Sequence, residues 1–134
     1  MKARVLGTGI SASGARKLLE AKGYSLVEEG EADLTIIPPG MPPQPGTIGE
    51  AELAMRFMRQ PVIGITGSNG KTTLTLLIAA VVGGRALGNV GSSLCDYLVD
   101  SQDEIVVAEL SSFQLETMST PALDVAIVTT ITPD

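Results

Sequence analysis

The stretch Val62-Ile63-Gly64-Ile65-Thr66-Gly67-Ser68-Asn69-Gly70-Lys71-Thr72-Thr73 contains the motif from which the fold is predicted. Its β-branched residues predict a buried strand over 62–66, and the apolar residues after the motif predict a helix over 71–82. The glycines between them let several backbone N–H groups face one phosphate, and the helix N-terminus adds a positive field. The match is to the short G-x-x-G-K-T form, because Ile65 stands where the strict motif has glycine. The alternative is a glycine-rich turn with a solvent-exposed lysine.

The motif also predicts how a triphosphate and a metal ion would be held. The Lys71 ammonium would reach the β- and γ-phosphate oxygens, and the Thr72 hydroxyl would bind Mg²⁺. A magnesium ion on phosphates needs carboxylate oxygens, and Glu109 follows the apolar run 105–108, where a strand is expected to end. A solvated acid at a strand end is the alternative for Glu109.

A second glycine-rich turn lies near the start of the chain. A strand over 3–6 leads into Gly7-Thr8-Gly9-Ile10-Ser11-Ala12 and then into a helix over 15–22, which Gly23 ends. The turn matches the G-x-G-x-x-A dinucleotide fingerprint, with Glu28 or Glu29 as the acid for a ribose. A tight turn without ligand is an equally good interpretation of the glycines. Glu28 and Glu29 lie in a charge run, which is usually a solvated turn.

The remaining segments predict an α/β protein with a mostly parallel sheet. The prolines of 38–46 exclude a helix or a central strand there. Thr47 and Glu50 fit a capping box that opens a helix ending near Gln60. The other expected elements are strands over 24–27, 33–37, 85–87, 105–110 and 124–128, and a helix capped by 93–96 and ending near 100. We therefore expect a Rossmann-like βα unit over 1–60 and a phosphate-loop unit over 61–134.

Composition excludes several classes of site. The chain has no histidine and one cysteine, Cys95, so a Ser-His-Asp triad, an internal disulfide and a zinc cage are excluded. The net charge of −6 falls wholly on 61–134, where only Lys71 and Arg85 are basic, so nucleic acid is not expected as a partner. No apolar run approaches the ~20 residues of a membrane span. We expect a reduced, cytoplasmic protein.

Three blocks taken together resemble the Mur ligases: 64–73, Gly-Asn-Val-Gly at 88–91, and Glu-Leu-Ser-Ser-Phe-Gln-Leu-Glu at 109–116. The start is similar too, with Gly7-x-Gly9-Ile10-Ser11 and Pro39-Gly40 where that family has uridine-binding loops. The resemblance implies ATP-dependent amide formation in peptidoglycan precursor synthesis. The carboxylate of UDP-N-acetylmuramoyl-L-alanine would be phosphorylated and then attacked by the amine of D-glutamate.

The resemblance also implies a role for each matched residue. Thr72 and Glu109 would bind Mg²⁺, Glu109 and Lys71 being the catalytic pair. Asn89, Ser111 and Gln114 would lie by the muramoyl substrate. Gly9, Ile10 and Ser11 would lie near the uridine diphosphate. The residues that would hold ATP are Gly67, Ser68, Asn69, Gly70, Lys71, Thr72 and Thr73.

The chain departs from the family pattern at several points. An α/β segment is missing between Val27 and Asp33, Pro38 replaces a serine, and the helix after the motif is short. The sequence stops at Thr132-Pro133-Asp134, where the family continues with a histidine, so we expect the front part of a ligase with an incomplete active site. The alternatives are another phosphate-loop kinase or acyl-phosphate ligase, and a nucleotide-binding module without ligase activity. A GTPase is disfavoured because no Asn-Lys-x-Asp signature is present.

Overall fold

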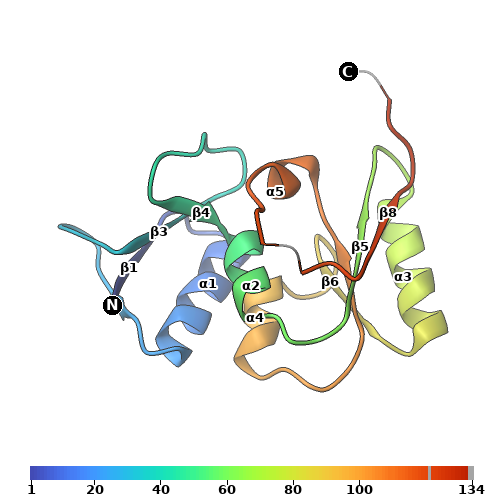
Figure 1. Cartoon of the computed structure of the whole chain (residues 1–134), viewed down its shortest axis with the longest axis horizontal. Helices are drawn as coiled ribbons and strands as arrows, with labels where there is room; N and C mark the ends of the chain where they lie inside the picture. The colour runs from blue at the N-terminus through green and yellow to red at the C-terminus, as the bar shows by residue number, and fades with distance from the viewer. Residues whose placement is uncertain (121, 133–134) are drawn as a thin grey trace.

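The computed structural model describes residues 1–120 and 122–132 as two four-stranded sheets with helices between and beside them (Figure 1). The strand order is β2-β1-β3-β4 in the first sheet and β6-β7-β5-β8 in the second, and every pairing is parallel. The elements are β1 (Lys2–Val5), α1 (Ile10–Ala21), β2 (Ser25–Leu26), β3 (Leu34–Ile37), β4 (Thr47–Gly49), α2 (Glu50–Phe57), β5 (Val62–Thr66), α3 (Lys71–Val82), β6 (Arg85–Gly88), α4 (Leu94–Val99), β7 (Val106–Glu109), α5 (Ser112–Glu116) and β8 (Val125–Val128). The predicted parallel α/β fold is confirmed.

Helices α1, α2 and α4 lie between the two sheets and share one apolar core with both (Figure 1). Leu18 of α1, Leu53 of α2 and Leu94 of α4 are buried in it. Val106 of β7 faces this core, whereas its neighbour Val107 faces a second cluster beneath α3. Because alternate residues of a strand point to opposite faces, a strand covered on both sides needs an unbroken apolar run.

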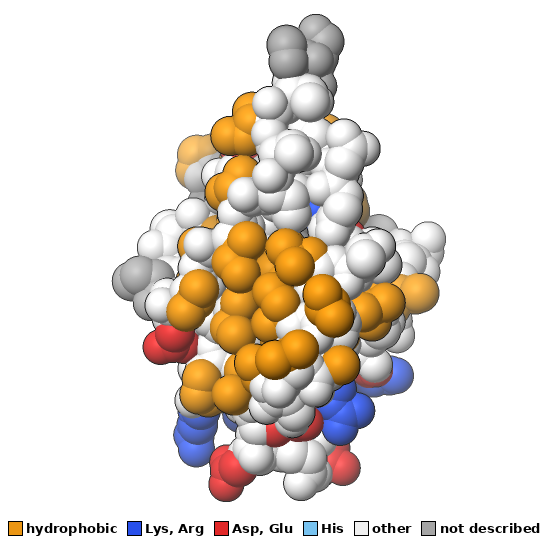
Figure 2. Space-filling model, turned by 90° about the vertical axis from the view of Figure 1, so that its right-hand side faces the viewer, with side chains coloured by type: hydrophobic (Ala, Val, Ile, Leu, Met, Phe, Trp, Pro, Cys, Tyr) orange, Lys and Arg blue, Asp and Glu red, His pale blue; other side chains and the backbone are white. Residues whose placement is uncertain are grey.

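Helix α3 carries several exposed apolar side chains. Figure 2 shows hydrophobic side chains gathered on this side of the molecule. Leu77 and Val81 are 58% and 77% exposed, and Val125 and Val128 of the edge strand β8 are also exposed. None of the helices in the described residues is long and apolar enough to cross a bilayer.

The predicted capping box at the start of α2 is wrong. Thr47 lies in β4 instead, and its hydroxyl accepts from the Gln44 N–H at 2.9 Å and donates to the Gln44 carbonyl at 2.6 Å. Gly49 takes the N-cap position and has no side chain to offer. The Glu50 carboxylate is directed to the N–H of Cys95 in α4, at 2.8 Å. A parallel strand pairing with β3 thus replaces the local cap that the sequence pattern predicted.

Two helix limits also differ from the prediction. Helix α1 begins at Ile10 rather than near residue 15, because the chain turns directly after Gly9, its N-cap. Helix α2 ends at Phe57 rather than near Gln60, where Met58 adopts an extended backbone. Because α1 already begins at Ile10, the first glycine turn is shorter than the sequence predicts.

Helix α2 is joined to the segment between α5 and β8 through its second buried acid, Glu52. The side chain of Glu52 is 1% exposed and accepts from the N–H groups of Ser119 and Thr120 at 2.8 and 2.9 Å. The Thr120 hydroxyl and the Arg56 guanidinium donate to its other oxygen at 2.6 and 2.9 Å. Burial raises the pKa of Glu52, but these hydrogen bonds outweigh it and lower the pKa to about 2 from an ordinary value of 4.5.

We expect Glu52 to make stability strongly dependent on acid pH. Because its folded-state pKa is lowered, the unfolded chain binds the proton more readily, and the stabilisation is complete above about pH 5 and lost as the pH falls from 4.5 to about 2. A shift of this size corresponds to about 3 kcal/mol of unfolding free energy. Urea denaturation should show Glu52→Gln less stable than the parent by about this amount at pH 7 and nearly equal to it at pH 2.

Glu20→Gln is the matched control, because Glu20 is exposed on α1. It should follow the parent at every pH. A Glu52→Gln variant that lost no stability at pH 7 would show that the hydrogen bonds from Ser119 and Thr120 to Glu52 do not stabilise the fold.

Candidate functional site

The glycine loop joins the carboxyl end of β5 to the N-terminus of α3, as predicted. Gly70 is the N-cap of α3, and the first hydrogen bond of the helix runs from the Leu74 N–H to the Gly70 carbonyl at 3.0 Å. The N–H groups of Lys71, Thr72 and Thr73 therefore precede the first helical donor and point out of the helix end. Backbone N–H groups in this position attract a phosphate together with the helix dipole.

The first half of the loop is bonded to another segment. The N–H groups of Ser68 and Asn69 donate to the carbonyl and the hydroxyl oxygen of Thr130, at 2.8 and 3.3 Å. Ser68 and Asn69 are predicted to contact ATP, but in this structure their N–H groups are already bonded to Thr130. An anion at the loop would thus meet the N–H groups of residues 70–73.

Thr72 and Glu109, the two predicted metal ligands, lie in contact. The Thr72 hydroxyl is 3.0 Å from each carboxylate oxygen of Glu109. Glu109 ends β7, opposite Ile65 in the parallel pairing with β5, and is only 4% exposed. A hydroxyl and a carboxylate are the hard oxygen donors that Mg²⁺ prefers, so the pair fits this ion. Among residues 1–120 and 122–132, no cluster of three His, Cys, Asp or Glu forms a ready metal site, so water and phosphate would have to supply the other ligands.

The three predicted muramoyl contacts form one hydrogen-bonded network next to Glu109. The Asn89 amide donates to the Gln114 side-chain oxygen at 3.1 Å, and the Ser111 N–H donates to the same oxygen at 2.7 Å. The Ser111 hydroxyl accepts from the Gln114 N–H at 3.2 Å, which completes a capping box at the start of α5. Asn89 also donates its own N–H to the Glu109 carbonyl at 3.1 Å.

Gly88 is what allows this network to form. Its φ of +97° is strained for residues with a Cβ, and a Cβ at this position would collide with the Glu109 carbonyl. The strands β6 and β7 can therefore place Asn89 directly beside Glu109 only with glycine at 88.

A cleft of about 250 Å³ opens beside the network, between the proline loop and α5. Gln114 and the exposed Phe113 form one wall, and the loop 38–43 forms the other. The buried Glu50 lines the cleft at the start of α2, and burial raises its pKa. Gln114 thus belongs both to the cleft and to the network that reaches Glu109.

A second cleft of about 430 Å³ lies over the first glycine turn. It is lined by 6–12, which includes the predicted contacts Gly9, Ile10 and Ser11. Pro38, Pro39 and Glu50 line both clefts, so the two adjoin. A ligand longer than either cleft could occupy both.

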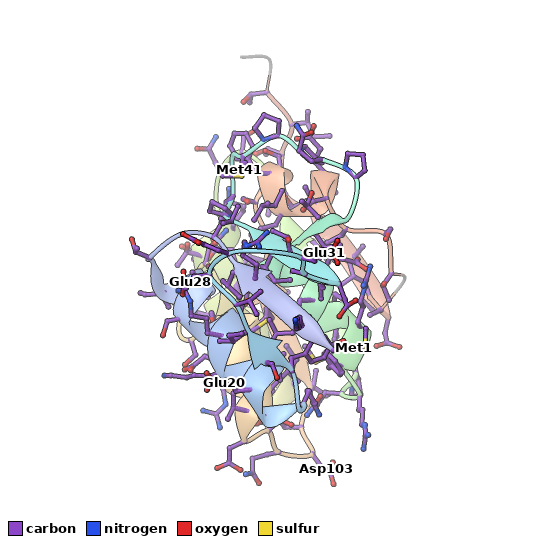
Figure 3. The ribbon with its side chains drawn as sticks, turned by 90° about the vertical axis from the view of Figure 1, so that its left-hand side faces the viewer. Met1, Glu20, Glu28, Glu31, Met41 and Asp103 are labelled. Carbon is purple, nitrogen blue, oxygen red and sulfur yellow. The ribbon has the colours of Figure 1, made fainter. Side chains whose placement is uncertain are left out.

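The acids proposed for a ribose are not part of this region. Glu28 and Glu29 are exposed in the turn after β2, and neither lines a cleft. Figure 3 shows Glu28 at the outer side of the first unit, below Met41 of the proline loop. The structure therefore favours the interpretation of Glu28 and Glu29 as a solvated turn.

Cys95 is a buried residue of the core, as its sequence surroundings predicted. Its thiol donates to the Glu50 carbonyl at 3.4 Å, and burial together with the Glu50 charge raises its pKa. A thiol held protonated is a poor nucleophile. The sequence pattern predicted Glu50 as part of a capping box and gave no signal that its side chain lines the clefts.

Comparison with curated proteins finds relatives that share one name, whereas no protein-family model matches the chain. The chain is similar to UDP-N-acetylmuramoylalanine–D-glutamate ligases from Desulfatibacillum aliphaticivorans, with 40% identity over 121 residues, and Protochlamydia amoebophila, with 38% over 143. The ligase of the same name from Pelotomaculum thermopropionicum is 39% identical over 133 residues.

These alignments take in most of the chain and a small part of each relative. They cover 78%, 88% and 87% of the chain but 27%, 32% and 29% of the three relatives. The chain thus spans about a third of the length of the curated relatives it matches.

Proposed function

Because the chain belongs to the Mur ligases, within the group of the UDP-N-acetylmuramoylalanine–D-glutamate ligases, we propose that it carries the nucleotide and UDP-substrate sites of such an enzyme. The reaction joins D-glutamate to UDP-N-acetylmuramoyl-L-alanine through an acyl phosphate at the expense of ATP. Residues 61–134 would bind Mg-ATP, and residues 1–60 would bind the uridine diphosphate. A cytoplasmic location, where ATP is supplied, is part of this proposal.

The loop residues stabilise negative charge. The N–H groups of 70–73 and the Lys71 ammonium would surround the phosphates, and their charge counters the repulsion between ATP and the substrate carboxylate. Thr72 and Glu109 would hold Mg²⁺, which supplies further neutralisation of the phosphate oxygens when bound. The Glu109 side chain is nearly inaccessible to water. Water would therefore screen its negative charge only weakly from a bound cation.

The observation that carries the proposal is the connection between the two sites. Asn89 contacts the backbone of Glu109 and the side chain of Gln114, and Gln114 lines the cleft. Two hydrogen bonds therefore link Glu109, the proposed metal ligand, to the wall of the cleft proposed for the substrate. In a ligase the substrate carboxylate must lie beside the γ-phosphate, and the short path from Glu109 to Gln114 supports this placement.

The uridine end of the substrate would lie in the cleft over 6–12. Gly9, Ile10 and Ser11 form the N-terminus of α1, where backbone N–H groups suit a diphosphate. Because the two clefts adjoin at Pro38, Pro39 and Glu50, one extended substrate would reach from α1 to Gln114.

We expect Gln114→Ala to weaken binding of UDP-N-acetylmuramoyl-L-alanine about tenfold and to leave Mg-ATP binding within about twofold, because one hydrogen-bonded contact in a cleft contributes roughly 1–1.5 kcal/mol. Titration calorimetry on the 134-residue chain measures both affinities. Asn89→Ala is a second variant that leaves the capping box of α5 intact and should show the same pattern.

The experiment separates the competing functions. Loss of both affinities in Gln114→Ala, with circular dichroism unchanged, would contradict a role confined to the muramoyl substrate. Mg-ATP binding without any binding of the UDP-linked substrate to the parent chain would favour a nucleotide-binding module over a ligase.

A further inference from the structure

The segment after β8 is hydrogen-bonded to the first half of the glycine loop. The Thr129 hydroxyl donates to the Asn69 carbonyl at 2.6 Å, and the Asn69 N–H donates to the Thr130 hydroxyl oxygen at 3.3 Å. The Thr130 carbonyl accepts from the Ser68 N–H at 2.8 Å, and the Thr129 N–H donates to the Thr66 carbonyl at 2.9 Å. We call Thr129 and Thr130 the threonine clasp.

Strand order explains why the clasp lies at the loop. In the second sheet β5 is flanked by β7 on one side and β8 on the other, and Thr66 pairs with Val128 at the end of β8. The clasp continues this pairing past the ends of both strands. Glu109 contacts Thr72 in the first turn of α3 from the β7 side, so contacts from both neighbours of β5 flank the loop.

Gly67 shows how closely the clasp fits. Its φ is +136°, and a Cβ built on it would collide with the Thr129 hydroxyl and lie 2.9 Å from the Thr130 N. The Thr132 N–H adds a further bond to the Ser68 hydroxyl at 3.1 Å. The backbone groups of Ser68 and Asn69 are thus satisfied by Thr129 and Thr130, which lie 60 to 62 positions away in the sequence.

We propose that Thr129 and Thr130 are positioning residues for phosphate binding, which rests on the proposed nucleotide site. By bonding residues 68 and 69, the clasp fixes the path of the loop and leaves the N–H groups of 70–73 as its anion-binding set. A loop ordered before the ligand arrives does not lose conformational freedom on binding, and this raises affinity. The clasp residues act through the loop and need no contact with the nucleotide.

The test compares Thr129→Val with Thr129→Ser. Valine keeps the shape and removes the hydroxyl that bonds Asn69, whereas serine keeps the hydroxyl. Thr35→Val, in β3 of the first sheet, is the matched control. Amide hydrogen exchange of the free chain reports on the loop at Ser68 and Asn69, and calorimetry reports on Mg-ATP.

We expect Thr129→Val to speed exchange at Asn69 about tenfold and to weaken Mg-ATP about fivefold, as one lost hydrogen bond predicts. Thr129→Ser should stay within about twofold of the parent in both measurements, as should Thr35→Val. An unchanged affinity in Thr129→Val, or an equal loss in Thr129→Ser, would overturn the positioning role.

The exchange measurement separates this proposal from the proposed function. If the parent chain bound no Mg-ATP, the proposed function would fail and the positioning role with it, whatever the exchange showed. If the parent bound Mg-ATP and Thr129→Val loosened Asn69 without weakening the ligand, only the positioning role would be overturned.

Discussion

Replacing Lys71 with alanine is expected to weaken Mg-ATP binding by about 100-fold, the largest effect of any single cation in the chain. Charge-assisted hydrogen bonds to phosphate contribute roughly 1.5–3 kcal/mol, which corresponds to this factor. Arg85, the only other basic residue in 61–134, cannot replace it, because its guanidinium is 3.5 Å from the Glu104 carboxylate and lies over the Tyr97 ring. The N–H groups of α3 alone would retain the residual affinity.

Lys17→Ala is the control for this variant. Lys17 is also a lysine on a helix, but its ammonium pairs with Asp96 at 3.2 Å, between α1 and α4. Titration calorimetry should show its affinity for Mg-ATP unchanged. Equal affinities for the parent and Lys71→Ala would contradict the assignment of the loop as a phosphate site.

Glu109→Gln is expected to abolish the dependence of ATP binding on magnesium. Glutamine keeps the shape and a hydrogen bond to the Thr72 hydroxyl but removes the negative charge that would hold the ion. In the presence of Mg²⁺ the affinity should fall roughly 100-fold, because a metal-bound carboxylate contributes several kcal/mol through charge. Without Mg²⁺ the variant should bind ATP at least as well as the parent, since the repulsion between Glu109 and the phosphates is gone.

A misfolded variant would lose affinity for ATP in both solutions, whereas the prediction is a loss with Mg²⁺ and no loss without it. Titrations with ATP in Mg²⁺ and in a chelator give the two affinities, and Asp103→Asn is the matched control. Asp103 is exposed before β7, whereas Glu109 ends that strand, so the control removes one charge from the opposite end. A fall in affinity of the same size in both solutions would contradict the metal role of Glu109.

The glycine loop and the positions of the residues around it could be predicted because their signals are local. Gly70 and Lys71 lie between a strand and a helix that the sequence shows clearly, and the structure has this helix at Lys71–Val82 as expected. Glu109 and Asn89 follow apolar runs, and parallel strands bring their carboxyl ends to one edge of the sheet. Neither step required knowledge of distant contacts.

The misses share a different origin, which is partners far apart in the sequence. Glu50 was expected to cap its own helix, but it bonds Cys95, 45 residues away, and Thr47 joined a strand instead. Glu52 gave no signal of its bonds to Ser119 and Thr120, 67 and 68 residues away. A local pattern cannot show which of two possible partners a carboxylate takes when the tertiary one is also buried.

The central claim, that the N-terminus of α3 binds a magnesium triphosphate, is tested most directly by backbone amide chemical shifts of the chain titrated with Mg-ATP. We predict the largest shifts at Gly70, Lys71, Thr72 and Thr73, with smaller ones at Glu109 and Asn89 across the sheet edge. Shifts confined to the first glycine turn at 7–12, or no saturable shifts, would contradict it.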